Sequence, residues 1–256
     1  MVRGLDKFRD YFKDHSDSYI IIGGTACDLI IGAAGLTPRA TRDIDIIIVV
    51  EALNPVFVTQ FWNFIKEGQY EKTEKNEDER KYYRFLKPAN ADFPYQVELF
   101  SRVPELLDIK EASHLTPIPV DDDLSSLSAI LMNDDYYNYT LNHCKEEKGI
   151  KRANTEALVC LKARAYLDMM ERKDNGKNAE EKNIKKHKAD VFRLSATLAE
   201  VDVFELPEAI QKDMQAFVDA TKNELPDKAM FKEMGLGNID PHTLLEQLIQ
   251  SFQLKN

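Results

Sequence analysis

The chain has 256 residues, of which 43% are hydrophobic and 30% are charged, and this composition is ordinary for a globular protein. Its longest apolar runs have the length of a strand, as in residues 46–50, which excludes a membrane-spanning helix. The first ten residues alternate between charged and apolar and lack the apolar centre of a secretory signal. We therefore expect a cytoplasmic protein that makes no use of a membrane.

The net charge of −10 bears on the class of partner. Proteins that bind tightly to the backbone of a nucleic acid usually carry a basic surface, because each neutralised phosphate adds to affinity. One basic run, residues 182–188, stands against this trend, and we interpret it as a solvated helix face. Cys27, Cys144 and Cys160 are widely spaced and odd in number, which favours a reducing compartment over a disulfide framework or a metal site.

The first 130 or so residues alternate between helical and strand patterns. The spacing of apolar residues predicts helices over 5–15, 25–34 and 55–67, and strands over 19–22 and 44–50. Two further strands, 81–86 and 95–100, flank a turn-rich segment. Short strands are expected at 118–120 and 128–132, and the start of a helix is the alternative for the second. Such alternation is typical of a mixed layer of helices and strands.

From about residue 134 the pattern becomes helical. Apolar residues recur at helical spacing over 155–171, 180–199, 206–222 and 241–253. We therefore predict an α+β fold in two parts. Residues 1–133 form a domain with a small mixed sheet flanked by helices, and residues 134–256 form a helical domain.

A glycine pair, Gly23-Gly24, followed by Thr25 joins the first strand to the next helix. Glycines at such a turn let the backbone approach a ligand, and the helix start offers unpaired amides to a phosphate. A purely structural turn is the alternative interpretation.

Two aspartates, Asp43 and Asp45, open an otherwise apolar strand. Side chains two apart on a strand share one face, so both carboxylates point the same way. Like charges side by side are costly unless a cation lies between them, and Mg²⁺ in phosphoryl-transfer sites is bound by one or two carboxylates. The alternative is a solvated strand entrance with two surface acids.

Glu98 is a lone acid between Val97 and Leu99 in a predicted strand. A neighbouring strand could place it beside the aspartate pair as a third carboxylate, which is what a two-metal site requires. An outward-facing strand residue is the other interpretation.

The order of these residues resembles the nucleotidyltransferase superfamily. Gly23-Gly24-Thr25, a helix, and then Arg39-x-Thr41-x-Asp43-x-Asp45 carry the likeness, with Glu98 as the later acid. The closer resemblance is to bacterial abortive-infection nucleotidyltransferase toxins of the AbiEii type. It implies a nucleotidyltransferase-fold first domain, a nucleotide site at the glycine turn and a metal site of Asp43, Asp45 and Glu98. Arg39 and Thr41 would support these residues around the nucleotide.

The toxin family also has a lysine on one following helix and an aspartate on the next. Here the matching residues are Lys162, in Leu161-Lys-Ala-Arg-Ala165, and Asp190, in Lys186-His-Lys-Ala-Asp190. By resemblance, Lys162 would contact the triphosphate or assist catalysis, and Asp190 would pair with or orient it. The long polar connection around residues 174–178 departs from the family pattern and weakens this pairing. His187, next to the lysines, we expect to be a solvated helix residue.

The resemblance implies a Mg²⁺-dependent enzyme that moves a nucleoside monophosphate from a nucleoside triphosphate to an acceptor hydroxyl. The acceptor would be tRNA or another RNA, and an antitoxin protein would be the partner. The net negative charge of the chain instead favours a small molecule or a protein hydroxyl as the acceptor. A nucleotide-binding regulatory module with degenerate catalysis and a non-catalytic scaffold are the remaining alternatives.

Overall fold

The structure is a computed structural model that describes residues 2–75, 82–100, 130, 133–176, 179–237 and 239–255. The chain divides into two compact units. The first unit comprises Met1–Asp28, Ala40–Asp121 and Cys144–Ala153. The second comprises Leu29–Arg39, Asp122–His143 and Asn154–Asn256. Each unit is described by itself.

The first unit is built on one mixed sheet. Among the described residues the sheet has seven strands in the order β3-β4-β5-β2-β1-β7-β6. β2 pairs antiparallel with β1 on one side and parallel with β5 on the other. Together with the helices, this sheet confirms the predicted α+β class. The strands are β1 (Tyr19–Ile22), β2 (Asp43–Ile48), β3 (Tyr70–Lys75), β4 (Tyr82–Pro88), β5 (Gln96–Phe100), β6 (Cys144–Glu147) and β7 (Ile150–Ala153).

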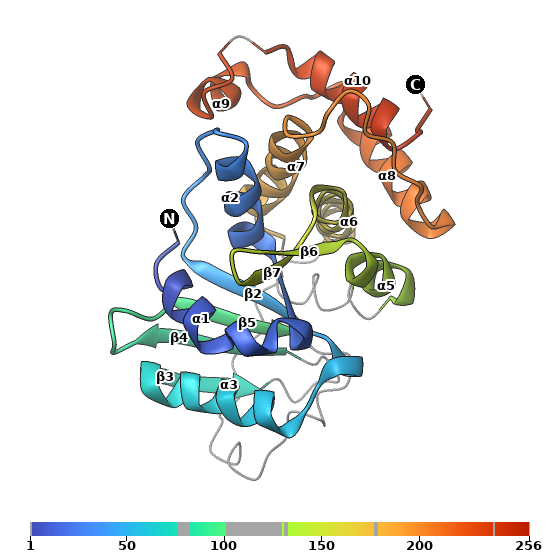
Figure 1. Ribbon diagram of the computed structural model, residues 1–256. Helices are drawn as coiled ribbons and strands as arrows, with labels where there is room; N and C mark the ends of the chain where they lie inside the picture. The colour runs from blue at the N-terminus through green and yellow to red at the C-terminus, as the bar shows by residue number, and fades with distance from the viewer. Residues whose placement is uncertain are drawn as a thin grey trace. The chain divides into compact units, whose positions relative to one another are not determined.

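Aromatic side chains join two helices to one face of this sheet. α1 (Leu5–Phe12) leads through a 3₁₀ turn, η1 (Lys13–Ser18), into β1, and α3 (Pro55–Gly68) follows η2 (Val50–Ala52) after β2. The ring centroids of Phe12 and Phe64 are 5.3 Å apart, and those of Phe61 and Phe85 are 5.6 Å apart. α1 and α3 therefore cover one face of the strands (Figure 1).

The alternation of strand residues decides which side chains lie on the opposite face. Phe85 packs under α3, so Arg84, its neighbour on β4, points the other way. By the same register, Val97 lies under the aromatic core while Glu98 lies on the other face. The face away from α1 and α3 therefore carries the polar side chains of β2, β4 and β5.

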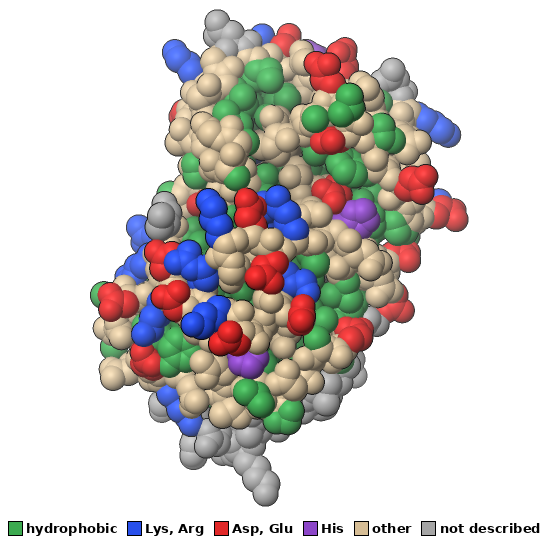
Figure 2. Space-filling view, viewed as in Figure 1, with side chains coloured by type: hydrophobic (Ala, Val, Ile, Leu, Met, Phe, Trp, Pro, Cys, Tyr) green, Lys and Arg blue, Asp and Glu red, His purple; other side chains and the backbone are tan. Residues whose placement is uncertain are grey.

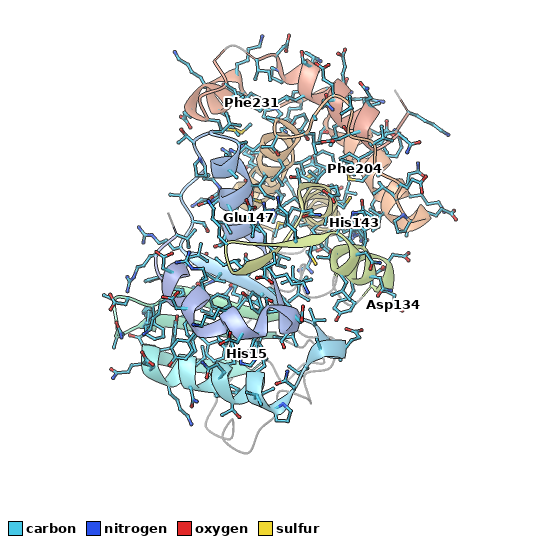
Figure 3. The ribbon with its side chains drawn as sticks, in the orientation of Figure 1. His15, Asp134, His143, Glu147, Phe204 and Phe231 are labelled. Atoms are coloured by element: carbon cyan, nitrogen blue, oxygen red, sulfur yellow. The ribbon has the colours of Figure 1, made fainter. Side chains whose placement is uncertain are left out.

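The second unit is helical in its described residues. Its helices are α5 (Asp134–Asn142), α6 (Thr155–Asp174), α7 (Glu181–Ser195), α8 (Glu208–Thr221), α9 (Lys228–Glu233) and α10 (Pro241–Ser251). α6 is mostly buried, and its Tyr166 ring meets Phe217 of α8 edge-on at 5.2 Å. Phe204, before α8, packs on Phe252, after α10, with ring centroids 5.3 Å apart (Figure 3). α2 (Gly23–Ala33) begins in the first unit, and the boundary between the units falls after Asp28.

Several elements differ from the sequence-based expectation. Residues 144–153 form the β6–β7 hairpin, not part of a helical region, because Lys148 and Gly149 both adopt positive φ and make a tight turn. β3 and α9 were not predicted. The strands expected at 118–120 and 128–132 fall almost wholly outside the described residues. The basic run 182–188 is a solvated face only in part, since His187 and Lys188 are each 9% exposed.

Within the described part of the chain, none of the helices has the length and apolar character needed to cross a membrane.

Candidate active site

Three carboxylates lie on neighbouring strands of the first unit. β2 and β5 run in parallel with Asp45 opposite Glu98 and Asp43 opposite Gln96. Asp43 and Asp45 are half-buried, and Glu98 is 7% exposed. Side chains directly opposite on adjacent strands are within contact reach. The structure therefore brings together the three acids that the sequence singled out.

Glu98 has partners of its own on this face. Its Oε1 lies 2.9 Å from Nε of Arg84, which is opposite it on β4, and it also accepts a hydrogen bond from the Gln96 amide. Burial raises the pKa of Glu98 well above its usual value, and the negative charge of Asp45 adds to this effect while Arg84 opposes it. The arginine thus offsets part, but not all, of the crowding among the carboxylates.

The glycine turn lies directly against Asp45. Gly23 has φ +64°, and a Cβ built on it would lie 1.6 Å from Oδ2 of Asp45. A Cβ on Gly24 would lie 2.8 Å from Oγ1 of Thr41. The Thr25 hydroxyl donates to the backbone carbonyl of Asp43 and is fully buried. Gly23, Gly24 and Thr25 therefore bring the start of α2 against the carboxylate end of β2.

A Gly23→Ala substitution tests this close approach. Its side chain would collide with Asp45 and would occupy a left-handed conformation that L residues disfavour. We expect the free energy of unfolding to fall by about 1–3 kcal/mol, because both the strain and the displaced carboxylate weaken the first unit. Urea unfolding followed by circular dichroism measures this change.

Gly32→Ala is the matched control. Gly32 lies on the same helix, and a Cβ built there meets nothing within 4 Å. Alanine is the better helix former, so this substitution should leave stability unchanged or raise it by about 0.5–1 kcal/mol. Equal destabilisation by the two substitutions would contradict the steric argument.

The donor set on this face fits a hard divalent cation in part. Carboxylate oxygens are the ligands that Mg²⁺ prefers, and Asp43 and Asp45 supply two of them from one strand. The crowding that raises the pKa of the buried Glu98 is the situation that a cation would relieve. Among the described residues, however, no group of three or more His, Cys, Asp or Glu side chains is arranged to hold a metal ion. The two aspartates fit Mg²⁺, and Glu98 as a third ligand stays a prediction.

The second unit holds a buried ionic cluster around Asp190. Nζ of Lys162 lies 3.4 Å from Oδ2 of Asp190, and Nη1 of Arg193 lies 3.1 Å from Oδ1. Nε of Arg39 is 3.6 Å from the same Oδ1. Burial by itself would raise the pKa of Asp190, but Lys162, Arg39, Arg193 and His187 outweigh it and hold the pKa below its usual value.

The cluster adds a contact for one predicted residue and changes the environment of another. Arg39, which was expected to support the aspartate pair, forms an ion pair with Asp190. His187 was expected in solvent, whereas it is 9% exposed and contributes to the environment of Asp190. The pairing of Lys162 with Asp190 is present, and the nucleotide-binding roles of Lys162, Arg39 and Thr41 stay predictions.

Sequence reasoning missed three residues that shape these clusters: Arg84, Gln96 and Arg193. A signal existed for two of them. Arg84 is a charged residue within the otherwise aromatic and apolar run Tyr82-Tyr-Arg-Phe-Leu86, which indicates a partner of opposite charge. Arg193 follows Asp190 by three positions, a spacing that puts both on one helix face.

Comparisons with known proteins were made at the level of families, curated sequences and solved structures. No protein-family model matches the chain, and no curated protein matches it closely. Among solved structures, the chain is similar to an antigenic nucleotidyltransferase-like protein from Paracoccidioides brasiliensis. The identity is 15%, the alignment covers 91% of this chain and 94% of that one, and the TM-score is 0.43. A likeness at these values carries no argument about function.

Proposed function

We propose that the protein is a Mg²⁺-dependent nucleotidyltransferase, which moves a nucleoside monophosphate from a nucleoside triphosphate to an acceptor hydroxyl. The observation that carries the proposal is the placement of Asp43 and Asp45 on one face of β2, with the Gly23 turn against Asp45. A two-residue carboxylate pair beside a glycine turn at a helix start combines ligands for a cation with amides for a phosphate.

Asp43 and Asp45 would hold the ion, which when bound supplies positive charge to the triphosphate and its developing negative charge. The glycine turn lets phosphate oxygens approach the backbone amides at the start of α2. Glu98, next to Asp45, would accept a proton from the acceptor hydroxyl. In such a reaction, positioning and electrostatics supply most of the acceleration.

The second unit enters the proposal through Lys162. Lys162 is 7% exposed and its ammonium lies 3.4 Å from Asp190, so its position is fixed before a ligand arrives. A pre-positioned ammonium is suited to a phosphate oxygen, and the surrounding arginines keep Asp190 ionised. The role of Lys162 in contacting the triphosphate, with Asp190 orienting it, therefore remains part of the proposal.

The acceptor follows from the resemblance alone. Abortive-infection toxins suggest tRNA or another RNA, a cognate antitoxin and a cytoplasmic, bacterial setting. The net charge of −10 supports a small molecule or a protein hydroxyl instead. On the face shown in Figure 2, basic and acidic side chains are interspersed.

The proposal is tested by following label from each of four α-³²P-labelled nucleoside triphosphates in the presence of Mg²⁺. Total RNA, total protein and no added macromolecule serve as acceptors. A labelled RNA band supports the toxin-like reaction, and labelled protein supports a protein hydroxyl. Binding of triphosphate without transfer to any of these would favour a nucleotide-binding regulatory module, and absence of binding would refute the proposal.

A further inference from the structure

The side chains around Glu98 form a row across three strands. Arg84 on β4 is opposite Glu98 on β5, and Glu98 is opposite Asp45 on β2. Adjacent strands lie about 4.7–4.9 Å apart, so Glu98 has a guanidinium on one side and a carboxylate on the other. The order of charges across the sheet is positive, negative, negative.

The oxygen Oε1 of Glu98 is already engaged. It accepts from Nε of Arg84 at 2.9 Å and from the amide of Gln96, which lies two residues earlier on the same strand and face. Both partners come from the sheet, so the contact does not depend on a loop. The side chains of Arg84 and Glu98 are 15% and 9% exposed, which leaves little solvent to screen their charges.

A second divalent ion at Oε1 of Glu98 would have to share this position with the guanidinium. A cation that used Oε1 would lie beside the positive charge of Arg84, and the burial of the pair would keep that repulsion strong. Arg84 already supplies positive charge at the edge of the acid group. The arrangement among the described residues also offers no set of three ligands for a metal.

We propose that Arg84 and Gln96 hold Glu98 away from metal ligation, so that the centre binds one divalent ion through Asp43 and Asp45. This inference rests on the proposed function for the ion itself, but it concerns how many ions bind and which carboxylates bind them. Arg84 is accordingly a positioning residue for Glu98.

The experiment counts bound ions on the full chain with Mn²⁺ alone, by electron paramagnetic resonance of free Mn²⁺ during a titration. We expect one ion per chain. Glu98→Gln should keep one ion with an affinity within about threefold of the original, whereas Asp43→Asn should lower the affinity by about tenfold or more. Two ions on the unsubstituted protein, or a tenfold loss in Glu98→Gln, would overturn the inference while leaving the proposed function standing.

Arg84 supplies the complementary variants. Arg84→Gln removes the charge and releases Glu98, so a second ion should bind, whereas Arg84→Lys keeps a positive charge and should retain one ion. Circular dichroism checks that both variants are folded. A count of one in Arg84→Gln would overturn the part assigned to the guanidinium. Absence of Mn²⁺ binding in the unsubstituted protein would instead refute the metal-dependent function and this inference together.

Discussion

Asp45→Asn is expected to lower the proposed nucleotidyl transfer by about 10³-fold, which is the largest effect that we expect from a single substitution in the first unit. Asparagine keeps the shape of the side chain but loses the negative charge that would hold the ion against the triphosphate. Because Asp45 lies beside the buried Glu98, loss of its charge also relieves repulsion. The variant should therefore be at least as stable as the original protein. Initial rates with labelled triphosphate at saturating Mg²⁺, together with urea unfolding, measure both quantities.

Asp10→Asn is the matched control for this substitution. Asp10 is an aspartate of the same unit whose side chain is 76% exposed and which lies 3.8 Å from Nε of Arg9. An exposed pair of this kind contributes little, so activity and stability should stay close to the original values. Full activity in Asp45→Asn would refute the assignment of the aspartate pair, and a collapse of stability in that variant would show that its charge serves the fold.

The strand that carries the aspartates was predictable because its signal is local. Residues 44–50 are almost wholly apolar, and Asp43 and Asp45 alternate with them, so the period of two places both acids on one face. The structure begins β2 at Asp43 and thereby includes the pair in the strand itself. The isolated acid Glu98 was likewise placed on a strand, which the structure has as β5.

The order of the strands was not predictable from the same signal. Nothing in the sequence of β2 or β5 specifies that they pair in parallel with Asp45 opposite Glu98, because register depends on the packing of whole faces. The Arg84 contact follows only from that register, and so it was missed. The β6–β7 hairpin was missed because β6 is a mostly polar edge strand with a weak periodic signal. The dipeptide Lys148-Gly149 was the sequence feature that indicated a turn between two strands.

In the second unit, the helical pattern identified α6 and α7 but misjudged the buried face of α7. That face is wider than its apolar residues indicate, and it includes His187, Lys188 and Asp190. A charged residue is predicted to be solvated when only its own helix is considered. Tertiary packing, however, can bring oppositely charged side chains that stabilise it in a buried position. The resemblance to a known family, not the periodicity, pointed to the pairing of Lys162 with Asp190.

Asp190→Asn is expected to destabilise the second unit by about 3 kcal/mol at neutral pH, because removal of one partner leaves buried cations without their counter-charge. A side-chain nitrogen of each of Lys162, Arg39 and Arg193 lies within 3.6 Å of one oxygen of this carboxylate. Folding lowers the pKa of Asp190. The carboxylate therefore stabilises the fold fully at a pH above its pKa in the unfolded chain, about 4, and this stabilisation is lost as the pH falls through its pKa in the folded protein. Urea unfolding at pH 7 and at lower pH should therefore show a penalty that shrinks on acidification.

Asp213→Asn separates this effect from that of an ordinary ion pair. Asp213 belongs to the same unit, accepts from the Tyr136 hydroxyl at 2.9 Å and lies 3.2 Å from Nη1 of Arg164, with its side chain 24% exposed. Asp213 is more exposed than Asp190, and among the described residues its ion pair is with one cation, Arg164. The substitution should lower the free energy of unfolding by about 1 kcal/mol, because the asparagine can still accept a hydrogen bond from the Tyr136 hydroxyl. Addition of Lys162→Met to Asp190→Asn should recover part of the loss, since it removes one uncompensated charge. A double variant as unstable as the sum of the two single variants would contradict a charge-balanced cluster, and the role assigned to Lys162 would then need a different physical basis.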